Sequence, residues 1–325
     1  MKSTRPNYIL YLTGGGRFAN QLLTMAHFLA FFEENKHLNL HIFNLNFYYF
    51  AKEINPVFKN ELYYLSIHKK WYLSLLVSVF KLLDFLLPRK PIRYILDFIK
   101  YCISTWAAGK TINVKTESFN LSPTVFEDTN QIVLHGWSIR CWELLEKHQN
   151  VVRNQLLPNT IYLKKAQRYF NQIEKMGYDF VIGVLVRQTD YRLFDGGKFF
   201  FETSIYEYWV KQLYVLYTSK GHKVAFLITS DEETEFNGLE NSKIPFFIGT
   251  GNKKKGGHYM EDILELSMCN LIVSPPSTFA TMAAFWGEKA ILPLKYKEQA
   301  MNENDITSEN IFQLRHDSVF KAAIN

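Results

Sequence analysis

The sequence has 325 residues, of which 47% are hydrophobic and 21% are charged, and its net charge is +6. This composition excludes a disordered chain and allows two domains with sizeable cores. The three cysteines, Cys102, Cys141 and Cys269, are far apart and form no C-x-x-C pair, which argues against a disulfide framework and a thiolate metal site. Aromatic residues are spread along the whole chain, so they do not indicate a nucleic-acid surface.

The N-terminal residues predict a βαβ opening, with strand, helix and strand at residues 8–12, 21–34 and 38–45. Between the first strand and the helix lies the turn TGGGRFANQ. Its residues Gly14, Gly16 and Ala19 match the G-x-G-x-x-[GA] spacing of a loop that binds a dinucleotide pyrophosphate. A plain tight turn explains the same glycines, so both interpretations stay open at this point.

The dinucleotide interpretation also needs an acidic residue at the end of the second strand, where it would bind the ribose hydroxyls. That strand ends at Asn44 and Asn46, whereas Glu33 and Glu34 fall on the preceding helix. An NAD(P)-dependent oxidoreductase is therefore a minority interpretation.

Residues 71–87, WYLSLLVSVFKLLDFLL, form the most apolar stretch of the first half. The stretch is shorter than the about 20 apolar residues that a spanning helix needs, and Lys81 and Asp84 interrupt it. We favour a core helix followed by a solvated basic turn, and the alternative is a helix that lies in the membrane surface through residues 71–93. The N-terminus is polar and has no signal-peptide pattern, so we expect a cytoplasmic protein, with a peripheral contact on the inner membrane face as the alternative.

The second half predicts alternating strands and helices. Residues 180–186, FVIGVLV, are typical of a parallel strand that is buried on both faces. After it we predict strands at 223–228, 244–248 and 271–274 and helices at about 205–219, 260–269 and 278–286. Before it, the sequence predicts a strand at 131–137 and one helix at about 143–157, which Pro158 ends.

Loops after the predicted strands carry polar residues, and open α/β sheets bind ligands at such loops. Arg187 leaves its strand with Asp190 three residues later; a guanidinium can grip a phosphate with two hydrogen bonds, and a carboxylate can orient it. Ser277 and Thr278 begin a helix after two prolines, where hydroxyls and free N–H groups form an anion site. A surface ion pair and ordinary helix capping are the structural alternatives.

Two aspartates fit helix capping better than catalysis. Asp231 follows its strand and is expected to begin an acidic helix N-terminus, and Asp262 is expected on the first turn of its helix. His135 and His258 lack partner ligands at a useful spacing, and no D-x-D motif occurs. The sequence therefore predicts no metal site.

Taken in order, these segments resemble the motifs of GDP-fucose-dependent fucosyltransferases. GGGRFANQ resembles the GG-x-GNQ opening of α-1,2-fucosyltransferases and, through GRF-x-NQ, that of protein O-fucosyltransferases. LHGWSIRCW resembles their middle segment, VLVRQTDY is similar to HVRRGDY, TSDEETEF to SDD, and SPPSTFATMAAFWG to the SSF loop and the helix after it. The order of the motifs matches over most of the chain, except at about residues 48–125.

The resemblance implies an α/β fold of the GT-B type, in which two Rossmann-like domains enclose an interdomain cleft. Residues 1–165 would form the acceptor-side domain, with a variable helical insert at about 48–125, and residues 166–325 the nucleotide-sugar domain. The implied activity is the inverting, metal-independent transfer of fucose from GDP-fucose to a glycan hydroxyl, as in the synthesis of bacterial surface polysaccharide, without a cofactor and without nucleic acid. The alternatives are a glycosyltransferase for another nucleotide sugar and a non-catalytic sugar-binding protein of the same fold.

The resemblance also implies roles for single residues. Arg187 would contact the donor diphosphate with help from Ser277 and Thr278, Asn20 would lie near the reacting sugar, and Asp190 is a candidate base. Donor-binding positions would be Gly15, Gly16, Arg17, Arg187, Asp231, Asp262, Ser277, Thr278 and Phe279. The sequence departs from the family pattern at three positions, which leaves the donor base open: these are Leu185 for His, Gln188 for Arg and Thr189 for Gly.

Overall fold

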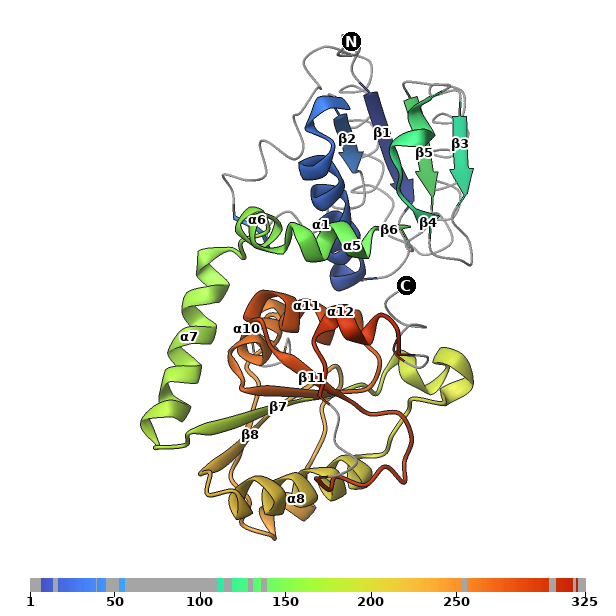
Figure 1. The fold of residues 1–325 in the computed structure, drawn as a ribbon. Coiled ribbons are helices and arrows are strands. Elements are labelled where there is room, and N and C mark those ends of the chain that lie inside the picture. The colour runs from blue at the N-terminus through green and yellow to red at the C-terminus, as the bar shows by residue number, and fades with distance from the viewer. Residues whose placement is uncertain are drawn as a thin grey trace. The chain divides into compact units, whose positions relative to one another are not determined.

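The computed structural model describes residues 7–13, 17–38, 40–44, 53–55, 110–113, 119–127, 131–135, 139–252, 256–303, 308–317 and 320. The chain divides into two compact units, Met1–Asn159 with Asn325, and Thr160–Ile324. Each unit contains its own parallel sheet (Figure 1), so the predicted α/β class is confirmed. The boundary expected at 165/166 stays a prediction, and the helix expected at 71–87 lies outside the described residues.

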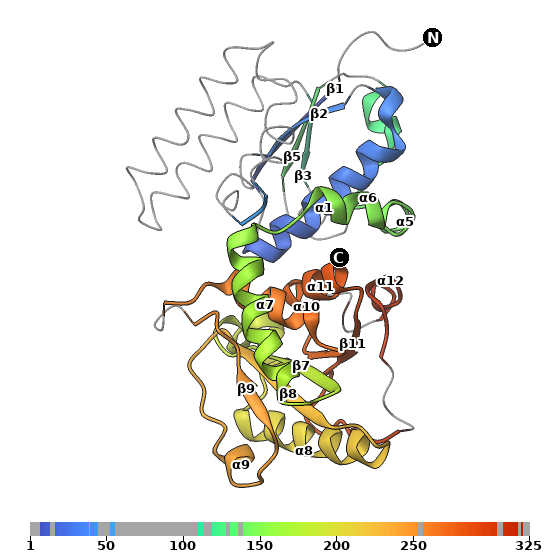
Figure 2. The same ribbon diagram turned by 90° about the vertical axis from the view of Figure 1, so that its left-hand side faces the viewer.

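The first unit is built on a four-stranded parallel sheet in the order β2-β1-β5-β3. Helix α1 (Phe18–Glu34) joins β1 to β2 and covers one face of the sheet (Figure 2), where Phe28 packs edge-on against Tyr11 of β1. Apart from Asn20, the residues of the helix from Phe18 to Phe31 are buried, as expected for a sequence that is apolar on most sides. The predicted βαβ opening is confirmed, and the strands of the sheet are β1 (Asn7–Thr13), β2 (Leu40–Asn44), β3 (Lys110–Asn113) and β5 (Gln131–His135).

Shorter elements complete the first unit. The single helix predicted at 143–157 is wrong, because α5 (Trp142–Lys147) ends before His148 and α6 (Gln149–Gln155) begins after it. The ring of His148 contacts the carboxylate of Glu34 at the end of α1, with 2.6 Å between His148 Nε2 and Glu34 Oε2, so the interruption is tied to a tertiary contact. The remaining elements are η1 (Lys36–Leu38), η4 (Pro123–Phe126) and the paired strands β4 (Phe119–Asn120) and β6 (Ile139–Arg140).

The second unit contains a five-stranded parallel sheet in the order β11-β10-β7-β8-β9. Numbered along this unit, the order is 3-2-1-4-5, as in Rossmann-type sheets. The chain reverses its winding direction between β7 and β10, and such switch points are where these sheets bind ligands. The strands are β7 (Phe180–Val186), β8 (Val224–Ser230), β9 (Phe246–Ile248), β10 (Leu271–Ser274) and β11 (Ala290–Pro293).

Helices cover both faces of this sheet (Figures 1 and 2). On one face, Trp209 of α8 packs into the core with Val184 of β7. On the other face, Phe170 of α7 packs with Val181 of β7, and Gly183 allows α10 to approach so closely that a Cβ there would lie 2.8 Å from Leu266. The helices are α7 (Thr160–Lys175), α8 (Thr203–Ser219), α9 (Asn237–Glu240), α10 (Tyr259–Met268), α11 (Thr278–Gly287), α12 (Ile311–Leu314) and the short η5 (Asp190–Arg192) and η6 (Phe194–Gly197).

Within the described ranges, none of the helices combines the length and the apolar composition that crossing a membrane requires.

Candidate functional site

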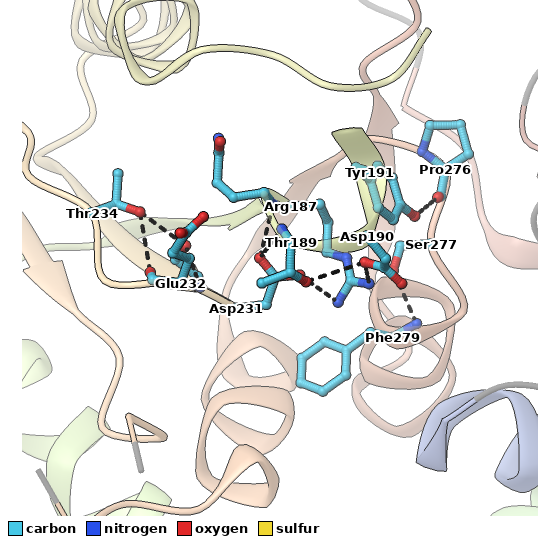
Figure 3. Close-up of polar contacts among 12 residues, drawn as sticks. Arg187, Thr189, Asp190, Tyr191, Asp231, Glu232, Thr234, Pro276, Ser277 and Phe279 are labelled. Carbon is cyan, nitrogen blue, oxygen red and sulfur yellow. Dashed lines mark hydrogen bonds and ion pairs between the residues drawn. The ribbon is translucent and has the colours of Figure 1, made fainter. Parts of the chain in front are cut away.

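The loops that follow β7 and β10 carry the main candidate residues of the second unit. Arg187 comes directly after β7, and Ser277 precedes α11 in the loop after β10. The two strands pair side by side, so their carboxyl ends bring these loops together at the switch point (Figure 3).

The guanidinium of Arg187 lies between two carboxylates (Figure 3). Its Nη2 donates to Oδ1 of Asp190 at 2.7 Å, and its Nη1 lies 3.2 Å from Oδ2 of Asp231. The guanidinium carbon is also 4.8 Å from the centre of the Tyr191 ring. The side chain is only 12% exposed, and its buried Nε has no hydrogen-bond partner in the described structure. The guanidinium is therefore held in one orientation and keeps an unused N–H donor.

Asp231 does not begin a helix, so the capping role expected for it is wrong. Residues 231–236 are not helical, and α9 starts only at Asn237. Its Oδ1 accepts hydrogen bonds from the backbone N–H groups of Gln188 at 2.8 Å and Thr189 at 3.3 Å, and its Oδ2 accepts from the Thr189 hydroxyl at 2.7 Å. The carboxylate thus forms hydrogen bonds to the loop after β7 from the end of the neighbouring strand β8. Asp231 thus fixes the loop that carries the arginine.

Tyr191 connects the loop after β7 with the loop after β10. Its buried hydroxyl donates to the carbonyl of Pro276 (Figure 3). Burial raises the pKa of Tyr191, and the positive charge of Arg187 offsets part of this effect, so the hydroxyl stays protonated and keeps its role as a donor.

The N-terminus of α11 is capped by Ser277, as the capping alternative predicts. The Ser277 hydroxyl accepts a hydrogen bond from the N–H of Phe279 at 3.2 Å (Figure 3), and both Ser277 and Thr278 are buried. A helix start leaves further N–H groups without intrahelical acceptors and carries the positive end of the helix dipole. An anion bound to Arg187 would therefore also be stabilised by the N-terminus of α11.

Asp262 belongs to a separate group of acidic side chains. It lies on the first turn of α10, as predicted, but the N-cap is His258. Its Oδ1 accepts from the N–H of Gly251 at 2.8 Å, while Glu265 accepts from the N–H and the hydroxyl of Thr250. Burial raises the pKa of Asp262 to about 7 and the pKa of Glu265 to about 7. Both carboxyl groups hold the turn that follows β9.

The candidates in the first unit are only partly described. Arg17 is the exposed N-cap residue of α1. Asn20 lies on the first helical turn, and its buried Oδ1 has no hydrogen-bond partner in the described part of the chain. Gly15 and Gly16 lie outside the described residues. The donor-binding or catalytic roles of these four residues stay predictions.

Gln188 and Leu185, two of the positions that depart from the family pattern, have contacts inside the protein. The amide of Gln188 donates to the carbonyl of Phe201 at 2.8 Å and is buried, so it serves the loop and does not supply a second cation. Leu185 pairs in register with Thr229, whose buried hydroxyl has no partner in the regions described. Thr189 and Tyr191 were not predicted as site residues, although both flank Asp190 in the Arg187 motif.

Among the described residues, no group of three or more His, Cys, Asp or Glu side chains is placed to hold a metal ion. The ring of His258 stacks on Tyr162, and its Nδ1 accepts the N–H of Met260, which gives this histidine a structural role.

No protein-family model and no curated protein matches the sequence. Solved structures do resemble the fold. A mutant of Arabidopsis thaliana FUT1 in complex with GDP has a TM-score of 0.52 and 11% identity, over 94% of this chain and 75% of its own. Fucosyltransferase NodZ from Bradyrhizobium has a TM-score of 0.50 and 14% identity, over 94% and 99%. The expected resemblance to GDP-fucose-dependent fucosyltransferases is thus confirmed at the level of the fold, which this α/β chain shares with them.

Proposed function

We propose that the protein is a glycosyltransferase that moves fucose from GDP-fucose to a hydroxyl of a glycan acceptor, with inversion and without a metal ion. One observation carries the proposal: a fixed guanidinium, Arg187, lies at the switch point beside the loop that starts α11, in a chain that shares its fold with fucosyltransferases. The FUT1 structure contains GDP, which supports a guanosine diphosphate as the bound part of the donor.

In the proposed reaction the bond between the sugar C1 and the diphosphate oxygen breaks, and its electron pair leaves with GDP. Arg187 and the N–H groups at the start of α11 stabilise this developing charge. The acceptor hydroxyl oxygen forms the new bond to C1 from the opposite face and gives its proton to a base. Asp190 is the proposed base because its carboxylate is 48% exposed beside Arg187. A general base must first lie within hydrogen-bonding distance of the proton that it accepts, and only then does its pKa matter.

The other parts of the assignment follow the family resemblance. We propose a GT-B arrangement in which the first unit faces the acceptor and Asn20 lies near the reacting sugar or its diphosphate. Its Oδ1, which has no hydrogen-bond partner among the described residues, would accept from a sugar hydroxyl. Residues 48–125 would recognise the acceptor, a surface-glycan precursor to which fucose is joined in an α-1,2 linkage. A contact of residues 71–93 with the inner membrane face is the alternative to a core helix there. Failure of the protein to sediment with liposomes would remove the membrane contact from this proposal.

A donor with another base is the second candidate. It is favoured by Leu185, which stands where the family has a histidine near the nucleotide, and by the buried hydroxyl of Thr229 beside it, for which the described residues supply no hydrogen-bond partner. The two residues change the hydrogen-bonding groups available at the strand ends, so the base must be identified by experiment.

A screen of GDP-, UDP- and dTDP-sugars by thermal stabilisation tests the proposal, because a ligand of the folded state raises its stability by mass action. We expect GDP-fucose and GDP to stabilise the protein and Arg187→Ala to lose this effect with its own melting temperature kept. Release of GDP in the presence of a glycan acceptor then distinguishes a transferase from a binding protein. Stabilisation by UDP- or dTDP-sugars alone would contradict the guanosine assignment.

A further inference from the structure

The two carboxylates on Arg187 differ in how far they are exposed to solvent. Asp231 is 12% exposed and also accepts three hydrogen bonds from the loop after β7. Asp190 is 48% exposed, and the Thr189 hydroxyl lies 3.3 Å from it, compared with 2.7 Å from Asp231. The inner carboxylate is built into the loop, whereas the outer one covers the guanidinium from the solvent side.

The outer carboxylate stands where an arriving phosphate would bind. Arg187 offers Nη2 on the side of Asp190, since Nη1 faces Asp231. A carboxylate oxygen and a phosphate oxygen on the same guanidinium nitrogen would lie within a few ångströms of each other, and like charges at that distance repel. A diphosphate that reaches Arg187 from the solvent side would therefore compete with the Asp190 carboxylate for Nη2.

We propose that Asp190 is an internal competitor of the donor diphosphate. In the donor-free protein its carboxylate occupies the outer face of the Arg187 guanidinium; the diphosphate displaces it, and the released carboxylate becomes available to the acceptor hydroxyl. The inference rests on the proposed function, in which the diphosphate binds Arg187. It predicts an order: the donor binds first, because the base is engaged until the diphosphate arrives.

The inference predicts the sign of a change in affinity. If Asp190 competes, Asp190→Asn and Asp190→Ala should bind GDP more tightly than the wild type. If it only positions Arg187, both variants should bind GDP more weakly. An exposed ion pair contributes about 0.2–1 kcal/mol, so the expected gain is up to about fivefold. High salt screens such a pair, and the gain should shrink there.

Glu232→Gln is the matched control. Glu232 is 42% exposed and pairs with Arg192 at 3.0 Å, so its replacement removes the same charge from a similar surface pair that does not include Arg187. We expect its GDP affinity to stay within about twofold of the wild type, because exposed charges beyond direct contact are strongly screened.

The experiment is a calorimetric titration of GDP into the full chain and its three variants at low and high salt, with the melting temperature of each free protein as a check of folding. Tighter binding by both Asp190 variants, but not by Glu232→Gln, supports the competition. Unchanged or weaker binding by folded Asp190→Asn overturns it. A wild-type protein that does not bind GDP at all would contradict the proposed function instead, so the two failures are distinguishable.

Discussion

Asp262 provides a stability switch whose sign can be derived from the structure. Burial raises the pKa of its carboxyl group from 3.8 to about 7, although the N–H of Gly251 favours the charged form. Between these two values the folded state binds more protons than the unfolded state, so stability falls as the pH rises from about 4 to about 7 and stays low above it. The pKa of Glu265 is raised in the same direction.

Asp262→Asn should remove this loss of stability. The amide has no charge at any pH and keeps an oxygen that can accept the Gly251 N–H bond. One pKa unit corresponds to about 1.4 kcal/mol, and the rise from 3.8 to about 7 gives an upper bound of about 4 kcal/mol. We therefore expect the variant to be more stable than the wild type at pH 8, by an amount up to this bound, and equally stable near pH 4.

The assay is calorimetric unfolding of the full chain at several values between pH 4 and pH 8.5, with hydrogen exchange of residues 249–265 as the local measure. Glu207→Gln is the matched control, because Glu207 also accepts a backbone N–H bond, from Gly238 at 2.7 Å, but is only half-buried. Its pH dependence should follow the wild type. A wild-type protein that gains stability between pH 5 and pH 8, or an Asp262→Asn variant that is less stable at pH 8, would refute the argument.

Three further predictions concern the same unit. Tyr191→Phe should weaken GDP binding about five- to tenfold, since it removes the hydrogen bond that joins the loop of Arg187 to the loop before α11. Tyr169→Phe, which loses a hydrogen bond to the carbonyl of Ile248, should not change GDP binding in the same titration. Arg187→Lys should weaken GDP binding at least about tenfold, because an ammonium cannot replace the two-pronged grip, and affinity near wild type would contradict this. Gly251→Ala should lower the free energy of unfolding by about 1–3 kcal/mol, because its Cβ would lie 2.3 Å from an Asp262 oxygen; an unchanged melting curve would show that the turn can move.

The sequence predicts those elements whose signal is local. The apolar run of β7 is bounded as expected, and the helices around 205–219 and 260–269 shift by two residues or fewer. Strand β11 was missed because four apolar residues cannot be distinguished from the tail of a helix. Helix α7 was also missed, although Ala166, Phe170 and Ile173 give it one buried stripe.

The candidate site, too, could be predicted only where its residues lie close together in the sequence. The neighbourhood of Arg187 and Asp190 can be read from their spacing in the sequence. The partnership of Arg187 with Asp231 cannot, because it depends on a strand register that pairs Val186 with Ser230 and so brings the following residues together. Capping was the better local prediction for Asp231, and the tertiary contact overrode it.

The strand order of the second unit has a consequence for its synthesis. Strand β7 lies in the middle of the sheet, yet its neighbour β10 begins only at Leu271. On the ribosome, the edge of β7 that faces β10 therefore stays without its partner while the residues up to Ser274 are made, and parallel pairing over such a separation is slow. The need for chaperones and the loss to aggregation during expression should then depend on how quickly the residues from Leu271 onward follow. A pause in translation before Leu271 should lower the soluble yield.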